Sequence, residues 1–216
     1  MIDLHTHSLL SDGVLLPSEL VRRAEVKGYE AIAITDHVDF SNIDFVIPRI
    51  VRTCRISNKY RKIKAIPGAE ITHVPPESIN ELVKFARRKG AKIVVGHGET
   101  ISEPVSPGTN RAFINAGADI LAHPGKISVE DIKLAKSKKV LLEITTKKNH
   151  SKTNRRLVKL ALKHKAPLVL NTDTHAPEDL IDNNKRKKFL ASLGVQSDDI
   201  NKIIRNSYNI VINIKL

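Results

Sequence analysis

The stretch from residue 2 to residue 34, IDLHTHSLLSDGVLLPSELVRRAEVKGYEAIAI, contains the unit that decides the fold. It opens and closes on short apolar runs, at residues 2–4 and 31–34, and Pro17 and Gly28 bracket a helical stretch between them. Proline favours the first turn of a helix, and glycine favours its end. The stretch therefore predicts a strand, a helix from residue 17 to about residue 27, and a second strand.

The same alternation recurs along the whole chain. Unbroken apolar runs of this kind are typical of strands buried on both faces of a parallel sheet. We expect them at residues 2–4, 31–34, 64–66, 92–95, 119–122, 140–144 and 168–170. Further helices are expected from a capping box at Ser78 to Gly90, behind a Ser128 cap over 129–138, and over 151–165, 177–193 and 198–206. The last apolar run, 210–216, is expected to form an edge strand or a packed tail.

Strands and helices in alternation predict an α/β fold with a parallel sheet. About seven such units in 216 residues fit a small, closed or nearly closed barrel, with an open doubly wound sheet as the alternative. We expect a single domain over residues 1–216. The motifs described below lie in residues 1–177, and residues 178–216 are expected to add helices and a tail.

The charge balance favours anionic partners. Thirty-six basic residues against 23 acidic ones give a net charge of +13. Such a charge suits phosphorylated metabolites, nucleic acid or acidic membranes, and the alternative is a solvated lysine-rich surface. The single cysteine, Cys54, excludes an intramolecular disulfide and a thiolate zinc site. Neither a signal peptide nor a membrane-spanning run is expected, so the predicted location is cytoplasmic.

Histidines cluster at one end of the predicted strands. Six of the nine histidines lie at or just after the carboxyl end of a strand, and three carboxylates do the same. These residues are His5, His7, His37, His97, His123, His175, Asp12, Glu70 and Asp173. Ligand-binding and catalytic residues gather at the carboxyl-terminal face of a parallel barrel. The pattern therefore predicts a metal site.

The number of these side chains predicts more than one ion. Imidazole and carboxylate ligands suit Zn, Mn or Fe, and one ion cannot use nine ligands. Two or three ions bridged by a carboxylate are typical of phosphoryl-transfer enzymes, in which they activate a water and bind phosphate oxygens. A metal-activated hydroxide attacking a phosphate ester is the expected chemistry.

The motifs resemble those of the PHP family, the polymerase and histidinol phosphatase group. The opening HxH and SDG motifs stand at residues 5–7 and 11–13, and TDH stands at 35–37. The later elements are Glu70 in GAE, His97, His123 in HPG, and DTH at 173–175. The resemblance covers residues 1 to about 177 and is closest to short, histidinol-phosphatase-like members.

The resemblance implies a distorted (β/α)7 TIM-like barrel that holds a trinuclear site of about three divalent ions. It assigns His5, His7, Glu70 and Asp173 to one ion. It assigns Glu70, His97 and His123 to a second ion, and Asp12, His37 and His175 to a third. It also implies hydrolysis of phosphate esters.

Other polar residues near the predicted strand ends are secondary candidates. Glu143 ends the sixth strand, where it could orient a ligand histidine. Lys147, Lys148 and His150 follow it, and we assign them provisional catalytic roles in binding phosphate or protonating the leaving group. Arg111 and Lys126 are weaker phosphate-binding candidates. His73 could border the pocket, although a single loop histidine is usually only exposed, and His164 is expected to lie outside the site.

These observations favour a metal-dependent phosphoric ester hydrolase acting on a small phosphate monoester. A nuclease or nucleotide phosphatase of the same chemistry is the alternative, supported by the net charge of +13. A non-catalytic nucleic-acid-binding subunit is disfavoured by the complete ligand set. Nucleic acid is less favoured than a small substrate because few aromatic residues are available to stack on bases.

Overall fold

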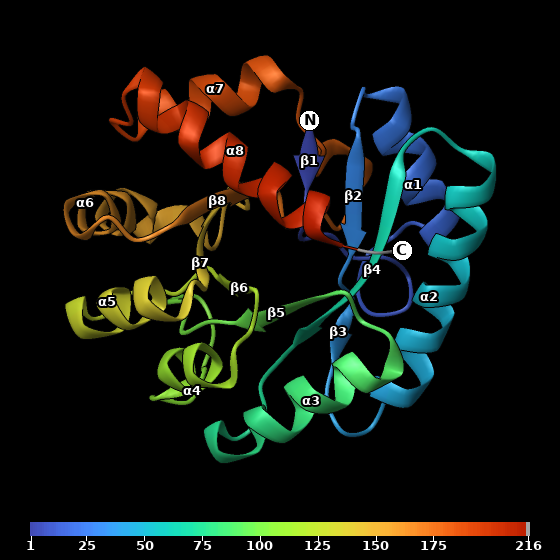
Figure 1. Cartoon of the computed structure of the whole chain (residues 1–216), viewed down its shortest axis with the longest axis horizontal. Coiled ribbons are helices and arrows are strands. Elements are labelled where there is room, and N and C mark those ends of the chain that lie inside the picture. The colour runs from blue at the N-terminus through green and yellow to red at the C-terminus, as the bar shows by residue number, and fades with distance from the viewer. Residues whose placement is uncertain (215–216) are drawn as a thin grey trace.

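The computed structural model describes residues 1–214, and its strands form one parallel sheet surrounded by helices (Figure 1). The order is β1-β2-β4-β5-β6-β7-β8, and β3 pairs with β4 beyond the end of β2. The strands are β1 (Ile2–Asp3), β2 (Ala31–Ile34), β3 (His37–Val38), β4 (Lys64–Ile71), β5 (Ile93–His97), β6 (Ile120–Ala122), β7 (Leu141–Thr145) and β8 (Leu168–Asn171). All seven predicted strands are confirmed.

The two ends of the sheet meet just past β1 and β8. Thr6 and Thr174 form a parallel bridge there. The backbone N–H of His7 donates to the carbonyl of Thr174 at 2.8 Å, and that of Asp173 donates to the carbonyl of His5 at 3.1 Å. The sheet is therefore a nearly closed seven-strand barrel, which confirms the predicted α/β TIM-like fold and excludes the open sheet.

Helices cover the outside of this barrel. They are α1 (Pro17–Val26), α2 (Ile43–Tyr60), α3 (Ile79–Lys89), α4 (Thr109–Ala116), α5 (Val129–Lys138), α6 (Asn154–His164), α7 (Asn183–Ser192) and α8 (Ser197–Asn213), with 3-10 turns at Pro76–Ser78, Ser151–Thr153 and Pro177–Asp179. The Ser128 cap is confirmed, since its side chain accepts from the N–H of Asp131. The capping box at Ser78 is wrong, because that hydroxyl donates to the carbonyl of Pro75 instead.

The apolar core has two layers, separated by the sheet. Alternate residues of each strand point to opposite faces. Ile66, Val95 and Val169 belong to the inner cluster, which fills the barrel. Their neighbours Ala65 and Val94 belong to the larger cluster between the strands and the surrounding helices.

Helix α8 closes the barrel at the amino-terminal ends of the strands. Val211 packs into the inner cluster, and its carbonyl accepts a hydrogen bond from Nζ of Lys64 at 2.9 Å. The edge strand expected at 210–216 is therefore wrong up to residue 213, because this part of the run continues α8; residues 215 and 216 lie outside the described part. Within residues 1–214, no helix combines the length and hydropathy needed to cross a membrane.

Candidate metal centre

The strands carry polar side chains to the carboxyl-terminal end of the barrel through their inward alternation. On β4 the inward positions run from Ile66 to Glu70, and on β5 they run from Val95 to His97. On β7, Glu143 follows the inward-facing Leu141 at the same spacing of two. Apolar residues thus fill the barrel below, and polar residues occupy its upper end, where every one of these side chains is buried.

Three residues reach the centre through left-handed backbone conformations. His123 has φ 28°, Asp173 has φ 55° and His73 has φ 52°. Such conformations are costly for residues other than glycine and cluster at functional sites. The turn after His123 also depends on Gly125, because a Cβ atom there would lie 1.8 Å from the carbonyl oxygen of Glu99.

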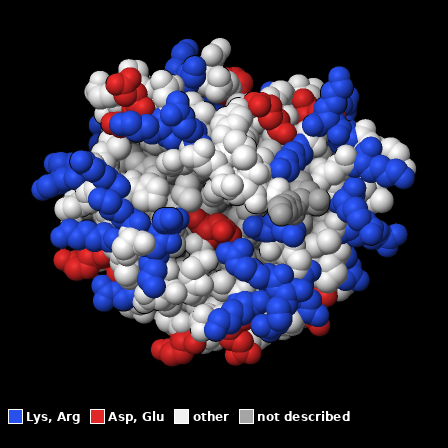
Figure 2. Space-filling view, viewed as in Figure 1, with Lys and Arg blue, Asp and Glu red and all other residues white. Residues whose placement is uncertain are grey.

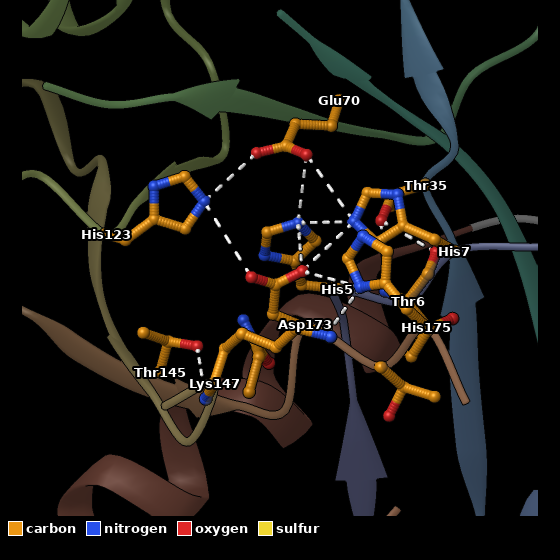
Figure 3. A network of polar contacts seen from close by, with 12 residues as sticks. His5, Thr6, His7, Thr35, Glu70, His123, Thr145, Lys147, Asp173 and His175 are labelled. Atoms are coloured by element: carbon orange, nitrogen blue, oxygen red, sulfur yellow. Dashed lines mark hydrogen bonds and ion pairs between the residues drawn. The ribbon is translucent and has the colours of Figure 1, made fainter. Parts of the chain in front are cut away.

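Glu70 contacts histidines of the cluster on both of its carboxylate oxygens (Figure 3). Its Oε2 atom lies 3.2 Å from Nε2 of His5 and 3.5 Å from Nε2 of His7, and its Oε1 atom lies 3.4 Å from Nε2 of His123. The carboxylate is fully buried, and its nearest neighbour is Nδ1 of His37, 2.9 Å from Oε2 but without the geometry of a hydrogen bond. A buried charge without hydrogen bonds is costly, and a cation bound between these groups would satisfy it.

Hydrogen bonds at Nδ1 leave Nε2 of several histidines free to bind a cation. Nδ1 of His5 lies 2.7 Å from the Glu143 carboxylate, which can only accept, so this nitrogen carries the proton. Nδ1 of His175 likewise donates to the carbonyl of Asp173 at 2.9 Å. Metal-binding histidines in proteins are oriented in this way.

The two Nε2 atoms of His5 and His7 lie 3.0 Å apart. Burial opposes a charge on His5, but Glu143 and Glu70 outweigh it and raise the pKa of His5 well above its usual value, so a metal ion would have to displace the proton from Nε2. Asp173 lies on the same side, with Oδ1 3.3 Å from Nε2 of His7. Two imidazole nitrogens and a carboxylate oxygen thus converge on one point, which suits a divalent ion.

The donor atoms fall into several overlapping groups that could each hold an ion. The groups are His7–Asp12–His37–His175, His5–His7–Asp173, His5–Glu70–His123, His123–His150–Asp173 and His73–His97–Glu103. The resemblance assigns Asp12, His37 and His175 to the third ion, and all three lie in the first of these groups together with His7. Of the residues assigned to the first ion, His5, His7 and Asp173 form one group, and Glu70 belongs to another.

His97 lies beside His123 of its predicted set, with ring centroids 4.5 Å apart, and also contacts a carboxylate that the set does not contain. Its Nε2 atom lies 3.1 Å from Oε2 of Glu103, and the same oxygen lies 2.9 Å from Nε2 of His73. His150 also contacts this carboxylate, at 3.3 Å from Oε1. The sequence prediction missed Glu103 and favoured an exposed position for His73 over a place at the pocket, since both residues come from loops rather than strand ends.

The secondary candidates have different surroundings. Glu143 contacts His5, as predicted for a residue that orients a ligand. Lys147 lines the cavity above the cluster, of about 450 Å³, and its Nζ atom lies 3.1 Å from Oδ2 of Asp179. Lys148 is exposed and does not line this cavity. Arg111 pairs with Asp131 outside it at 2.7 Å.

Burial and mutual charge shift the ionisation of the cluster. Burial opposes the charge of Glu70, but the neighbouring His5 and His37 outweigh it and hold the pKa of Glu70 well below its usual range. Burial alone would lower the pKa of His37, yet the Glu70 carboxylate raises it to about 9. Burial and the nearby His123 lower the pKa of His150 to about 4.

Comparisons with known proteins agree with this fold and arrangement. An uncharacterised protein of Methanocaldococcus jannaschii is 45% identical over 200 residues, which cover 92% of each chain. A probable phosphatase of Clostridium botulinum is 25% identical over 237 aligned positions, covering 89% of this chain and 94% of the relative. A chain in a cryo-EM structure of archaeal ribonuclease P with mature tRNA has the same fold, with a TM-score of 0.73 and 21% identity over 97% of this chain and 89% of that one.

The PHP domain family model matches residues 3–160, which include seven of the nine predicted ligands. The other two, Asp173 and His175, lie beyond the match, but the bridge between Thr6 and Thr174 brings them beside His5 and His7. The length of the match, together with the fold, establishes the family. The chain belongs to the PHP domain family.

Proposed function

We propose that this protein is a metal-dependent phosphoesterase that hydrolyses a small phosphate monoester. The observation that carries the proposal is the buried Glu70 carboxylate, whose two oxygens lie within 3.5 Å of nitrogens of four histidines, the nearest being Nδ1 of His37 at 2.9 Å. Membership of the PHP family and the similarity to a probable phosphatase support it. Divalent ions, when bound, would supply a water of lowered pKa and positive charge for the phosphate oxygens.

Three groups of residues would hold the ions. His5, His7 and Asp173 would hold one, and Glu70 and His123 would hold a second together with His97. The third would be held by Asp12, His37 and His175. Glu70 lies within 3.5 Å of His5, His7 and His123, so it is the carboxylate best positioned to bridge the first two ions.

Lys147 is the residue that we assign to the substrate phosphate. Asp179 holds its ammonium group at the cavity wall, at 3.1 Å, so its positive charge is positioned before substrate binds. A fixed cation at the edge of a metal cluster stabilises the charge that develops on a transferred phosphoryl group. His150 is unsuited to this role, because a pKa of about 4 leaves its ring neutral near pH 7.

The dimensions of the cavity favour a small substrate. About 450 Å³ is within the range of small-molecule sites. The residues that line it are histidines, carboxylates, one threonine and Lys147, and no aromatic side chain other than histidine is among the described lining residues. A polar phosphorylated metabolite matches these walls.

A panel of phosphate esters tests the proposal. Protein loaded with Mn²⁺ or Zn²⁺ should release inorganic phosphate from at least one small monoester, and chelation should abolish the reaction. Asp173→Asn should remove the activity while the protein stays folded by circular dichroism. His164→Ala, which removes a histidine of α6 outside the cluster, is the matched control and should retain the wild-type rate. Phosphate release by Asp173→Asn at the wild-type rate would refute the assignment.

A further inference from the structure

A second hollow lies at the other end of the barrel. It has a volume of about 1240 Å³ and runs between α8 and the segments that lead into β5, β6, β7 and β8. Figure 2 shows this side of the molecule, on which blue side chains lie around a central region that also contains red acidic atoms. The metal cluster lies at the carboxyl ends of the same strands, so the barrel separates the two sites.

The hollow is lined by eight apolar residues and by side chains that can donate hydrogen bonds. Five lysines and three asparagines contribute to its wall: Lys92, Lys136, Lys139, Lys165, Lys202, Asn206, Asn209 and Asn213. Two aspartates are also present, but each already has a cationic partner. Asp119 accepts from Arg87 at 3.0 Å, and Asp199 accepts from Lys202 at 3.0 Å.

Four of these lysines therefore carry uncompensated charge. Within residues 1–214, Lys92, Lys136, Lys139 and Lys165 have no carboxylate within 4.0 Å. Clustered like charges raise the local potential and attract anions. We call these four residues the basic groove.

Two of the groove lysines occupy strained positions. Lys139 has φ 59° and Lys165 has φ 55°, and they end α5 and α6 in the left-handed conformation. The equivalent position after α3 is Gly90, and that after α4 is Gly117. Glycine takes this conformation without cost, whereas a residue with a Cβ atom does not.

The placement of these strained residues suggests a function. The other non-glycine residues of the described chain with positive φ are His73, His123 and Asp173, and all three belong to the metal centre. A helix carboxyl terminus favours a nearby cation, but a lysine one position earlier supplies that charge without strain, as Lys89 does in α3. The strain at Lys139 and Lys165 therefore needs a further reason.

We propose that the basic groove binds the phosphate backbone of a double-helical nucleic acid. Lysine and asparagine side chains are common donors to phosphate oxygens. No aromatic side chain is among the described residues that line the hollow, so the surface lacks the platform on which unpaired bases stack. The hollow is also larger than typical small-molecule sites. Because the groove lies away from the metal centre, the nucleic acid duplex bound there is a docking partner and is not the substrate.

Fluorescence anisotropy with a labelled RNA duplex of about 20 base pairs tests this inference, with EDTA present so that the metal centre does not contribute. The full chain should bind with an affinity that falls steeply with salt. Lys139→Gly/Lys165→Gly should weaken binding at least tenfold and reduce the salt slope by about 2, one for each lost phosphate contact. The same variant should unfold at an equal or higher temperature, because glycine relieves the strain.

Further variants keep the test independent of folding. Lys92→Gln/Lys136→Gln changes only exposed groove residues and should also weaken binding about tenfold. Lys84→Gln/Lys188→Gln removes the same charge from exposed faces of α3 and α7 and should bind within about threefold of wild type. Lys139→Arg/Lys165→Arg should bind like wild type.

Several outcomes would overturn the inference. These are absence of duplex binding at 50 mM salt, equal weakening by the groove and control variants, or tighter binding of a single strand than of the duplex. The test is separate from the proposed phosphoesterase activity, because it is made without metal and without hydrolysis. A negative result for duplex binding would therefore not contradict the phosphoesterase proposal, and a negative result for hydrolysis would not contradict duplex binding.

Discussion

The imidazole of His5 and the carboxylate of Glu143 form a fully buried pair, in which Nδ1 and Oε2 are 2.7 Å apart. Asn171 also donates to this carboxylate oxygen, at 3.0 Å, and so fixes its orientation. Burial opposes the charge on Glu143, but His5 outweighs it and lowers the pKa of this carboxylate. Glu143 therefore stays ionised and holds the His5 ring with Nε2 facing Glu70.

Removing this partner should weaken metal binding. Glu143→Ala is expected to lower metal affinity by about 10- to 100-fold, the usual effect of losing a residue that orients a ligand histidine. Glu143→Gln keeps an acceptor oxygen for Nδ1 of His5, so its metal affinity should fall less than that of Glu143→Ala. Competition with a chromophoric chelator measures both affinities. Wild-type affinity in Glu143→Ala would contradict this role.

Lys147 and Lys148 are adjacent in sequence but differ in position, which makes them a matched pair. Lys147→Ala should reduce kcat/KM by about 10²-fold, the scale for losing one charge-stabilising group, because its ammonium group lies at the cavity wall. Lys148→Ala should stay within about twofold of wild type, because this side chain is exposed.

Steady-state kinetics on an active monoester measures both variants, and elemental analysis should find an unchanged metal content. Equal effects of the two substitutions would remove Lys147 from the site. Loss of metal in Lys147→Ala would instead make this residue part of the support for the cluster.

Glu103 should contribute to metal binding although it comes from a loop. Burial opposes its charge, but hydrogen bonds from His97 and His73 prevail and hold the pKa of Glu103 well below its usual range, so the carboxylate is ionised. Glu103→Gln should weaken the binding of one ion by about 10- to 100-fold. Glu77→Gln, on the exposed turn Pro76–Ser78, removes the same charge and should have no effect. Isothermal titration calorimetry distinguishes the two variants, and identical titrations would contradict the role of Glu103.

Metal binding should strengthen as pH rises. The pKa of His37 is raised to about 9 by Glu70, so this ring is protonated at neutral pH in the metal-free protein. A metal ion needs the neutral ring, and binding must therefore displace the proton. Below pH 9, this proton should by itself change the apparent affinity about tenfold per pH unit. His5, in which burial opposes the charge but Glu143 and Glu70 raise the pKa well above its usual value, should make the dependence steeper. Titrations with Mn²⁺ at pH 6.5, 7.5 and 8.5 measure the trend, and an affinity that does not change with pH would contradict it.

The predicted ligands could be recognised from the sequence because of the topology. In a parallel barrel, residues that follow different strands meet at one end, and so Glu70, His97 and Asp173 come together although they are far apart in the chain. The inward alternation of β4, β5 and β7 continues from the apolar core into the site without interruption. Strand position and side-chain type were therefore sufficient to predict that these side chains come together.

Glu103 and His73 could not be placed in the same way. Glu103 lies six residues beyond the end of β5, in a loop whose path depends on tertiary contacts such as that between Ser102 and the carbonyl of Asn149. His73 turns toward the cavity through a φ of 52°, which a residue with a Cβ atom rarely adopts. A left-handed histidine has no distinctive sequence signal.

Two helices were also absent from the sequence prediction. Helix α2 contains Pro48, which usually ends a helix, yet Ile43, Val46, Ile47 and Ile50 are all buried along one face of it. Packing of that face against the barrel outweighs the lost hydrogen bond. Helix α4 begins after Gly108 without a side-chain cap, so the sequence lacks the capping residue that would have predicted where this helix starts.

Elemental analysis of the metal-loaded protein tests the account most directly. The nine ligands predicted from the sequence, with Glu70 shared between two ions, predict about three divalent ions per chain. His164→Ala should bind the same number, whereas His7→Ala should bind fewer. A ratio near three in the wild type would support the multinuclear centre, and a ratio of one or none after loading with excess metal would contradict it.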